Sequence, residues 1–414
     1  MTTPVHAEAP SLHGRMIQLD VLRGVAILLV LVRHSPVPWS YAGVARPAML
    51  VLWRLGWTGV DLFFVLSGFL IGGLLFREIR TTGRLDVRRF LVRRGLKIWP
   101  AYLVYVAFVF CVVAYQTDLG RSFRAILPNL LHVQNYFGTP RGQTWSLAVE
   151  EHFYLALPLF LLLLLGVGRR RGAIIVGIPA TAITLIFVCT TLRVALNSHK
   201  TFEMFTDQTA THLRIDGLFF GVLIAYLYHL RPEIMARIGR HRLILLIVGL
   251  AIISPMALYD LSGRAYIWTI GFTLLYVGYG MILIAFVHTT PGNGIAGKLI
   301  SSRLARFVAW IGVFSYSIYL WQLDLAVAPV ERWVLPHLPH HPLTLLWVLG
   351  WIAYLVLAVV TGVIAAKLIE IPALAIRDRL FPARVAGLAV RRVTPSASLA
   401  ASPAAESEFS TTPG

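Results

Sequence analysis

The stretch IQLDVLRGVAILLVLVRHSPV, residues 17–37, is long and apolar enough to cross a membrane, yet it contains Arg23 and His34. Charged and titratable groups are expensive inside a bilayer, so we treat both residues as functional candidates. Eleven residues of α-helix place the two side chains within about 20° of one face and about 16 Å apart along the axis. A guanidinium and an imidazole on one face suggest an anion-holding group and a proton-transfer group. The alternative interpretation is an arginine that sets membrane topology and a histidine at the helix mouth.

The composition extends this reading to the whole chain. Hydrophobic residues make up 57% of the 414 residues and charged residues only 14%. A membrane span needs about 20 apolar residues, and several continuous runs meet that length. We therefore predict an all-α, polytopic integral membrane protein with about ten transmembrane helices. The predicted spans begin near residues 17, 57, 98, 145, 173, 214, 242, 265, 307 and 344.

The formal charge of +18 reflects topology rather than nucleic-acid binding. With both termini placed in the cytoplasm, more than twice as many of the 37 Lys and Arg residues fall on the cytoplasmic side as on the outer side. This distribution is what the positive-inside rule predicts. We expect the lipid bilayer, and not nucleic acid, as the macromolecular environment.

We expect three regions along the chain. Residues 1–15 form a cytoplasmic tail, residues 16–373 form the membrane domain, and residues 374–414 form a cytoplasmic, largely disordered tail rich in small polar residues and proline. Cys111 and Cys189 both lie in apolar runs, so no disulfide framework or metal site is expected.

A basic segment, RRFLVRRGLKIWPAYL, begins at residue 88 and contains Arg93, Arg94 and Lys97. Its helical spacing indicates an amphipathic helix at the cytoplasmic interface, where lipid headgroups alone could explain the charge. The functional alternative is a phosphate-binding site, because clustered arginines bind phosphate oxygens in a fork geometry.

The segment TWSLAVEEHFYLALPLF, residues 144–160, places Glu150, Glu151 and His152 at the predicted outer end of an apolar helix. Helix capping explains the hydroxyls and one glutamate. It leaves a carboxylate next to a histidine, which is the arrangement that general-base chemistry uses.

Other polar residues in apolar runs carry weaker signals. The glycines of GVDLFFVLSGFLIGGLLF, residues 59–76, indicate close helix packing, and Asp61 is placed to orient an arginine or a histidine. Arg214 and Asp216 form either a structural ion pair or a site. A polar stripe in GVFSYSIYLWQLDL, residues 312–325, is predicted to face the interior of the bundle, and Glu370 is predicted to end a helix.

Seven segments taken in order resemble the membrane acyltransferase-3 family, the bacterial O-acyltransferases of polysaccharides, peptidoglycan and macrolide sugars. They are LDVLRGVAILLVLVRH, FFVLSGFLIGGLLFRE, RRFLVRRGLKIWPAYL, TWSLAVEEHFYL, RIDGLFFGVLIA, GVFSYSIYLW and IEIP, which together run from about residue 17 to 373.

The resemblance implies a multi-pass protein of the bacterial inner membrane that uses acyl-CoA, by default acetyl-CoA, as donor substrate and binds no permanent cofactor. The acceptor is a carbohydrate hydroxyl, most often of a surface or exported polysaccharide such as an exopolysaccharide. Its motifs map onto Arg23 with His34, onto Glu150 with Glu151, and onto the arginine pair that begins at Arg93.

Two departures from the family pattern stand out. The family often has a histidine where this chain has Gln322, so a proton-transfer role is not expected there. We also expect no fused esterase domain, so that any partner that finishes the transfer is either a separate chain or unnecessary.

These observations combine into one mechanism. The phosphates of acyl-CoA bind Arg93, Arg94 and Lys97, and the thioester enters the bundle towards Arg23. His34 acts as general base on the acceptor hydroxyl or carries the acyl group itself, and Glu150 or Glu151 orients it.

The alternative from another class is a proton-coupled transporter or exporter of a saccharide or acyl species, since charged residues in a bundle also serve transport. No inverted repeat supports that reading.

Overall fold

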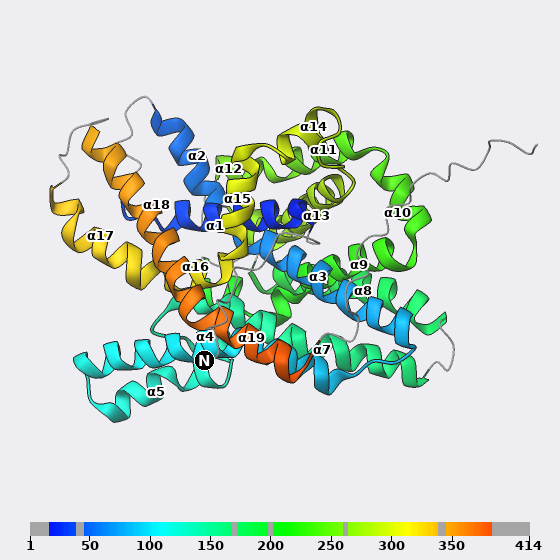
Figure 1. The fold of residues 1–414 in the computed structure, drawn as a ribbon, viewed down its shortest axis with the longest axis horizontal. Coiled ribbons are helices and arrows are strands. Elements are labelled where there is room, and N and C mark those ends of the chain that lie inside the picture. Colours follow the sequence, from blue (N-terminus) through cyan, green and yellow to red (C-terminus); the bar gives the residue numbers. More distant parts are fainter. Residues whose placement is uncertain are drawn as a thin grey trace, which may run out of the picture. The chain divides into compact units, whose positions relative to one another are not determined.

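The computed structural model describes residues 16–38, 45–167, 172–197, 202–259, 264–337 and 345–382, and all regular structure in these ranges is helical. The predicted all-α class is therefore confirmed. In chain order (Figure 1) the α-helices are α1 (Ile17–His34), α2 (Arg46–Gly56), α3 (Gly59–Thr82), α4 (Val87–Gln116), α5 (Leu119–Leu130), α6 (Gln134–Phe137), α7 (Trp145–Val167), α8 (Gly172–Asn197), α9 (Ile215–Leu230), α10 (Pro232–Gly239), α11 (Arg242–Ile253), α12 (Pro255–Leu258), α13 (Phe272–Val287), α14 (Gly294–Ile300), α15 (Arg303–Val313), α16 (Ser315–Gln322), α17 (Ala328–Trp333), α18 (Leu345–Ala365) and α19 (Ile371–Leu380).

Short helical turns of other types interrupt or join these helices. The turns are η3 (Gly142–Thr144), η4 (Met204–Gln208), η5 (Thr211–Leu213), η7 (Ile267–Gly271), η8 (Leu323–Val327), η9 (Leu335–His337) and η10 (Ala366–Glu370). Four of these turns, η4, η7, η8 and η10, are π-helical, a conformation that often marks functional positions. Two of the four carry acidic residues of the polar interior described below, Asp324 in η8 and Glu370 in η10.

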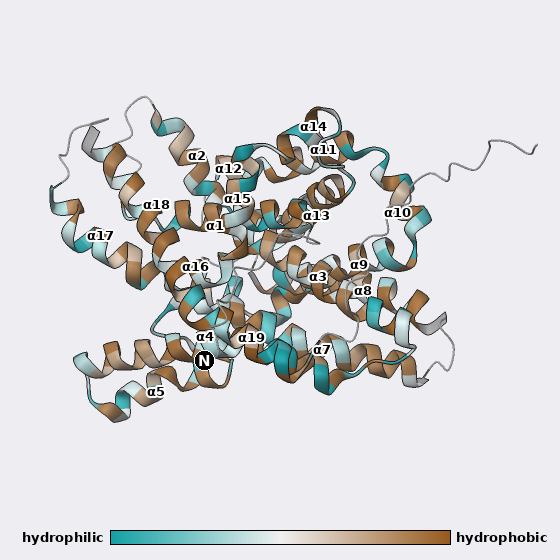
Figure 2. Cartoon of the chain, in the orientation of Figure 1, coloured by the Kyte–Doolittle hydropathy of each residue, from teal (hydrophilic) through white to brown (hydrophobic). Residues whose placement is uncertain are grey.

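Six helical segments among the described residues are long and apolar enough to cross a membrane, and the number rises to eight if two bent pairs are counted as single spans. The bent pairs are α9 with α10, at 107°, and the segment 303–337 that contains α15 and α16, at 65°. Helices α7 and α18 consist mostly of hydrophobic residues, drawn in brown in Figure 2. The predicted count of ten is not confirmed. The helix that begins at Ile17 carries Asp20, Arg23 and Arg33, and α11 with α12 is short.

The basic segment does not form a separate interfacial helix. It is the first part of α4, which continues without a break through Pro100 to Gln116. The reason is tertiary, because side chains of this segment bond to α7 and to the end of α19.

Helix α1 packs against both hydrophobic clusters of the bundle, and close backbone contacts hold it there. A side chain at Gly24 would collide with the carbonyl of Val308 in α15, and one at Gly312 would collide with the carbonyl of Asp20. The two glycines thus allow α1 and α15 to approach backbone to backbone, which is the packing that small residues permit between membrane helices.

The glycines of α3 serve the same purpose, as their sequence predicted. A side chain at Gly68 would collide with the Leu218 carbonyl of α9, and one at Gly221 would collide with the Val65 carbonyl of α3. The α3–α9 contact is therefore a small-residue helix interface.

Two buried ion pairs cross-link the helices around this interface. Arg214 bonds Asp61 of α3 at 2.6 Å, while Asp216 bonds Arg193 of α8 at 2.8 Å. Arg214 and Asp216 therefore do not pair with each other, and Asp61 orients an arginine as predicted. Arg193 is fully buried and also bonds Thr269, Thr190 and the backbone of Leu213.

The predicted N-terminal tail, residues 1–15, and residues 383–414 of the predicted C-terminal tail, which was placed at 374–414, lie outside the described residues. Helix α19 runs to Leu380, so ordered structure continues past the predicted domain boundary at residue 373. The helices of residues 16–382 form one compact unit.

The Arg193–Asp216 pair predicts a large loss of stability on substitution. Arg193→Met leaves the Asp216 carboxylate buried without its cation, so the free energy of unfolding in detergent is expected to fall by about 3–5 kcal/mol. The exposed Arg121–Asp118 pair of α5 is the matched control. Arg121→Met is expected to change stability by less than about 1 kcal/mol. Equal effects of the two substitutions would contradict a special role for the buried pair.

Candidate functional site

Arg23 and His34 lie on the same continuous helix, as predicted, and α16 runs along that helix. The Arg23 guanidinium donates a hydrogen bond to Ser315 Oγ at 3.1 Å, at the start of α16. The Gln322 amide, at the end of α16, lies beside the His34 imidazole. One pair of helices therefore connects the two ends of the candidate site.

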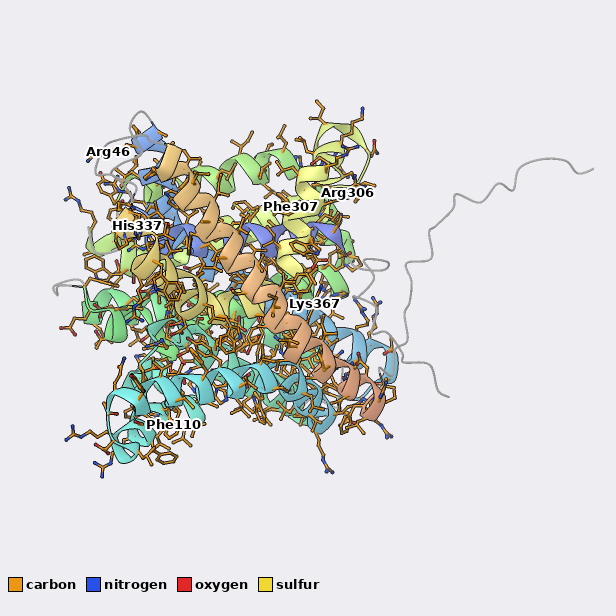
Figure 3. The ribbon with its side chains drawn as sticks, turned by 60° about the vertical axis from the view of Figure 1, so that its left-hand side comes forward. Arg46, Phe110, Arg306, Phe307, His337 and Lys367 are labelled. Atoms are coloured by element: carbon orange, nitrogen blue, oxygen red, sulfur yellow. The ribbon has the colours of Figure 1, made fainter. Side chains whose placement is uncertain are left out.

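The polar residues of α16 face inward, which confirms the predicted stripe. Ser315, Ser317, Tyr319 and Gln322 are all buried. Ser317 donates to Glu370 at 2.8 Å, so Glu370 contacts the stripe. Glu370 is the last residue of η10 and directly precedes α19, which agrees with its predicted position at a helix end. Lys367, labelled on the same turn in Figure 3, is exposed to the surroundings of the bundle.

A cluster of cations surrounds the Arg23 end of this stripe. Arg94 and Lys97 of α4 are turned into the bundle, and Lys97 lies within electrostatic reach of Arg94, Arg23, Glu370 and Arg377. Two predicted anion-binding residues of the basic segment are thus brought to Arg23, although about 70 residues separate them from it in sequence. We call Arg23, Arg94 and Lys97 the inner cation cluster.

Tyr154 of α7 organises the carboxylate side of this cluster. Its hydroxyl donates to Glu150 Oε2 at 2.5 Å and accepts a hydrogen bond from Arg94, and it lies 2.9 Å from Ser67 Oγ of α3. The Arg94 guanidinium also stacks over the Tyr154 ring, 4.2 Å from its centroid. Three helices therefore meet at one phenol. The spacing of Tyr154, four residues after Glu150 on one helix face, is a signal that the sequence analysis missed.

Glu150 and Glu151 point to different surroundings. Glu150 lies next to the inner cation cluster, because it accepts a hydrogen bond from Tyr154, which also bonds Arg94. Glu151 accepts a weak hydrogen bond from the Trp99 indole at 3.4 Å, while its Oε1 atom is buried without a hydrogen-bond partner among the described residues. The polar side chains that act most directly on His34 are those of Gln322 and Arg33.

His152 is directed away from the inner cation cluster. Its Nδ1 atom lies 2.7 Å from Thr211 Oγ1 of η5. His132, in the loop after α5, stacks on Tyr102 with ring centroids 4.9 Å apart and adopts a left-handed backbone with φ of 54°. Burial, and then the nearby His152, lower the pKa of His132 to about 4. His132 is therefore a neutral imidazole at physiological pH.

Arg93 and Arg94 are neighbours in sequence but diverge in the structure. Arg93 forms an ion pair with Asp378 of α19 at 3.1 Å and bonds the Phe381 carbonyl. Its side chain is 24% exposed, whereas Arg94 is directed inward. Arg93 thus lies at the rim of the bundle, outside the inner cation cluster.

A second polar network lies between α4, η3 and η8. Asp324 of η8 accepts hydrogen bonds from Tyr105 at 2.7 Å and from Arg141 at 2.7 Å. Gln143 donates to the Tyr105 hydroxyl at 2.7 Å, and the Tyr319 hydroxyl donates to the Gln143 carbonyl at 2.6 Å. This network fixes the chain beyond Gln322 and ties the loop before α7 to α16.

The arrangement offers two chemical functions at the ends of one buried polar stripe. The inner cation cluster can hold an anionic group such as a phosphate. His34 can accept a proton from a group placed beside Gln322. No set of three or more His, Cys, Asp or Glu side chains in the described ranges is placed to hold a metal ion.

Comparison with known proteins gives a consistent family match. A family described as acyltransferase domain matches residues 16–367. The chain is 26% identical, over 77% of its length, to a Bacillus subtilis protein whose name refers to peptidoglycan O-acetylation, YrhL, and covers 50% of that relative. It is 26% identical, over 78% of its length, to the O-acetyltransferase OatA of Staphylococcus aureus and covers 52% of it.

The chain therefore spans about half the length of the curated relatives that it matches. No solved structure matches it.

The hydrogen bonds of Tyr154 predict energetic coupling with Glu150. In a double-mutant cycle of Tyr154→Phe and Glu150→Gln, measured by unfolding in detergent, we expect a coupling energy of about 0.5–3 kcal/mol, because both changes break one bonded unit. The control cycle pairs Tyr154→Phe with Glu151→Gln. Since Glu151 bonds Trp99 instead, the control effects should add within about 0.5 kcal/mol. Coupling of equal size in both cycles would show that the two glutamates are not distinguished.

Proposed function

Because the chain belongs to the acyltransferase domain family, the membrane acyltransferase-3 proteins, we propose that it is an integral membrane O-acyltransferase. It transfers an acyl group, by default acetyl, from acyl-CoA to a carbohydrate hydroxyl. The observation that supports this proposal most directly is the buried polar stripe of α16, which runs from the cations around Arg23 to the imidazole of His34.

We assign the donor to the inner cation cluster. Coenzyme A carries several phosphates, and guanidinium groups bind phosphate oxygens well. Arg94 is held by Tyr154, and the Lys97 side chain is partly exposed, so both can meet a phosphate that enters from the side where α4 begins. Arg93 is the outermost donor contact in this proposal, and it reaches the ligand by exchanging its bond to Asp378. The thioester then points along α16 towards His34.

We assign the proton transfer to His34. It removes the proton of the acceptor hydroxyl as the oxygen attacks the thioester carbonyl, the C–S bond breaks, and the CoA thiolate takes up a proton. Arg23 stabilises the developing oxyanion or a CoA phosphate. Glu150 positions Arg94 through Tyr154. Glu151 is the carboxylate assigned to proton handling, because its Oε1 atom has no partner among the described residues.

The names of the relatives make peptidoglycan the first acceptor to test for this chain. Exopolysaccharide and other exported glycans are the further candidates, with glycan-synthesis or export proteins as partners. Because the chain matches only about half of the length of these relatives, the proposed acceptor concerns the membrane domain that they share with it.

We also propose ten membrane crossings in the bacterial inner membrane, with both termini in the cytoplasm. In this proposal the two bent pairs each count as one span, which gives eight spans, and α1 and the α11–α12 segment are the ninth and tenth. The bonds from Arg89 and Arg93 to Pro382 and Phe381 support a common side for the start of α4 and the end of α19. The excess of Lys and Arg on this side supports the cytoplasm.

The central test uses purified protein in proteoliposomes with acetyl-CoA and soluble peptidoglycan fragments. CoA release and ester formation, followed by mass spectrometry, are expected for the wild type. His34→Ala is expected to lower the rate by about 10²–10⁴-fold, because it removes the general base. His152→Ala is the matched control and should retain activity, because His152 bonds Thr211 away from the site.

Full activity of His34→Ala would exclude its role as base. Accumulation of saccharide in the vesicles without CoA release would favour a transporter instead.

The donor site predicts a selective change in acyl-CoA affinity. Arg94→Met removes a charge-assisted phosphate contact, so the KM for acyl-CoA is expected to rise about tenfold or more while the KM for the acceptor changes little. Arg121→Met removes an equal charge from exposed α5 and is expected to leave both KM values unchanged. An unchanged KM for acyl-CoA in Arg94→Met would move the phosphate site elsewhere.

A further inference from the structure

The amide of Gln322 is fully buried, and neither its Oε1 nor its Nε2 atom has a hydrogen-bond partner in the described part of the chain. Three other buried glutamines, Gln18, Gln134 and Gln143, each donate at least one side-chain hydrogen bond. Gln18 donates to the Thr289 carbonyl at 2.9 Å, and Gln143 donates to the Tyr105 hydroxyl. Buried polar groups are nearly always hydrogen-bonded, because removal from water without a partner costs free energy. An entirely unbonded amide at this place therefore requires an explanation.

The same place holds a third unbonded polar atom. His34 Nδ1 is buried and has no hydrogen-bond partner among the described residues. The Gln322 amide lies beside the imidazole but forms no hydrogen bond of normal geometry with it. Both residues belong to the helix pair that the Arg23–Ser315 bond joins at its other end. Two helices thus present a donor, an acceptor and an imidazole nitrogen at one buried point.

The chemistry of these atoms favours a neutral ligand group. The amide N–H can donate to the oxygen of a hydroxyl group, and the unbonded imidazole nitrogen can accept the proton of the same hydroxyl. The nearest cation in sequence, Arg33, stacks over the Trp53 ring at 3.8 Å. A phosphate finds better partners at the inner cation cluster, at the opposite end of α16.

We propose that Gln322 is a binding residue for the acceptor, and that its amide holds a saccharide hydroxyl beside His34. Gln322 Nε2–H donates to the hydroxyl oxygen, and the hydroxyl proton is directed to His34. The proton passes to the imidazole as the new C–O bond forms and the C–S bond of the thioester breaks. This inference rests on the proposed function and assigns the acceptor subsite within it.

The first experiment measures stability in detergent. Gln322→Met replaces the unbonded amide by an apolar side chain of similar size, so the unfolding temperature should stay the same or rise. Gln18→Met is the matched control, since it removes a formed hydrogen bond to Thr289 and should lower the unfolding temperature. A lower unfolding temperature for Gln322→Met would mean that the amide is bonded within the fold, and would overturn the proposal.

The second experiment separates acceptor from donor kinetics. In Gln322→Met, and in Gln322→Leu as a second apolar variant, the KM for the acceptor is expected to rise about five- to tenfold, as loss of one neutral hydrogen bond implies. The KM for acyl-CoA should not change. Gln18→Met should keep both KM values. An unchanged acceptor KM in both Gln322 variants would overturn the assignment.

The third experiment does not require catalysis, so it separates this inference from the proposed function. The disaccharide N-acetylglucosaminyl-N-acetylmuramic acid should raise the unfolding temperature of the wild type and of Gln18→Met, but not that of Gln322→Met. Equal protection of all three proteins, or no protection of the wild type, would overturn the saccharide subsite. If the wild type is protected but never releases CoA, the transferase proposal fails and the subsite stands.

Discussion

The need to pair every charge that is buried among membrane helices is the constraint on which this structure depends. Arg193 and Arg214 are almost completely inaccessible, and each is bonded to an aspartate on another helix. A buried ion pair is maintained because removal of one partner leaves an uncompensated charge. These pairs therefore fix how α3, α8 and α9 meet, and they hold the half of the bundle against which α1 packs.

Around the candidate site, the pairing of buried charged and polar groups is less complete than in these ion pairs. The cations around Lys97 have Glu150 and Glu370 as neighbouring anions, and Tyr154 shares its hydroxyl between Arg94 and Glu150. At the other end of α16, the Gln322 amide lies beside His34 but forms no hydrogen bond of normal geometry among the described residues. Each charge of the two buried ion pairs is bonded to its opposite on another helix, whereas both polar atoms of the Gln322 amide and His34 Nδ1 lack a hydrogen bond among the described residues. That contrast distinguishes the structural charges from the candidate site.

Sequence reasoning predicted the parts that depend on local periodicity and composition. The helical class, the shared helix of Arg23 and His34, the inward polar stripe and the glycine contacts of α3 all follow from spacing along one helix. It could not predict that Arg93 and Arg94 separate, because the choice depends on Asp378 and Tyr154, which lie far away in sequence. The buried role of Arg193 could have been predicted from the sequence, because a lone arginine in an apolar run is expected to have a partner inside the bundle.

The sequence by itself determined that this is a helical membrane protein of the acyltransferase domain family, with Arg23 and His34 on one helix face, because hydropathy and helical spacing are local properties. Only the tertiary structure decided which charges meet. It placed Glu150 with Arg94 and Tyr154, turned Lys97 towards Arg23, and set Gln322 beside His34. These contacts join residues on different helices, and their choice depends on how the helices pack, which no local pattern encodes.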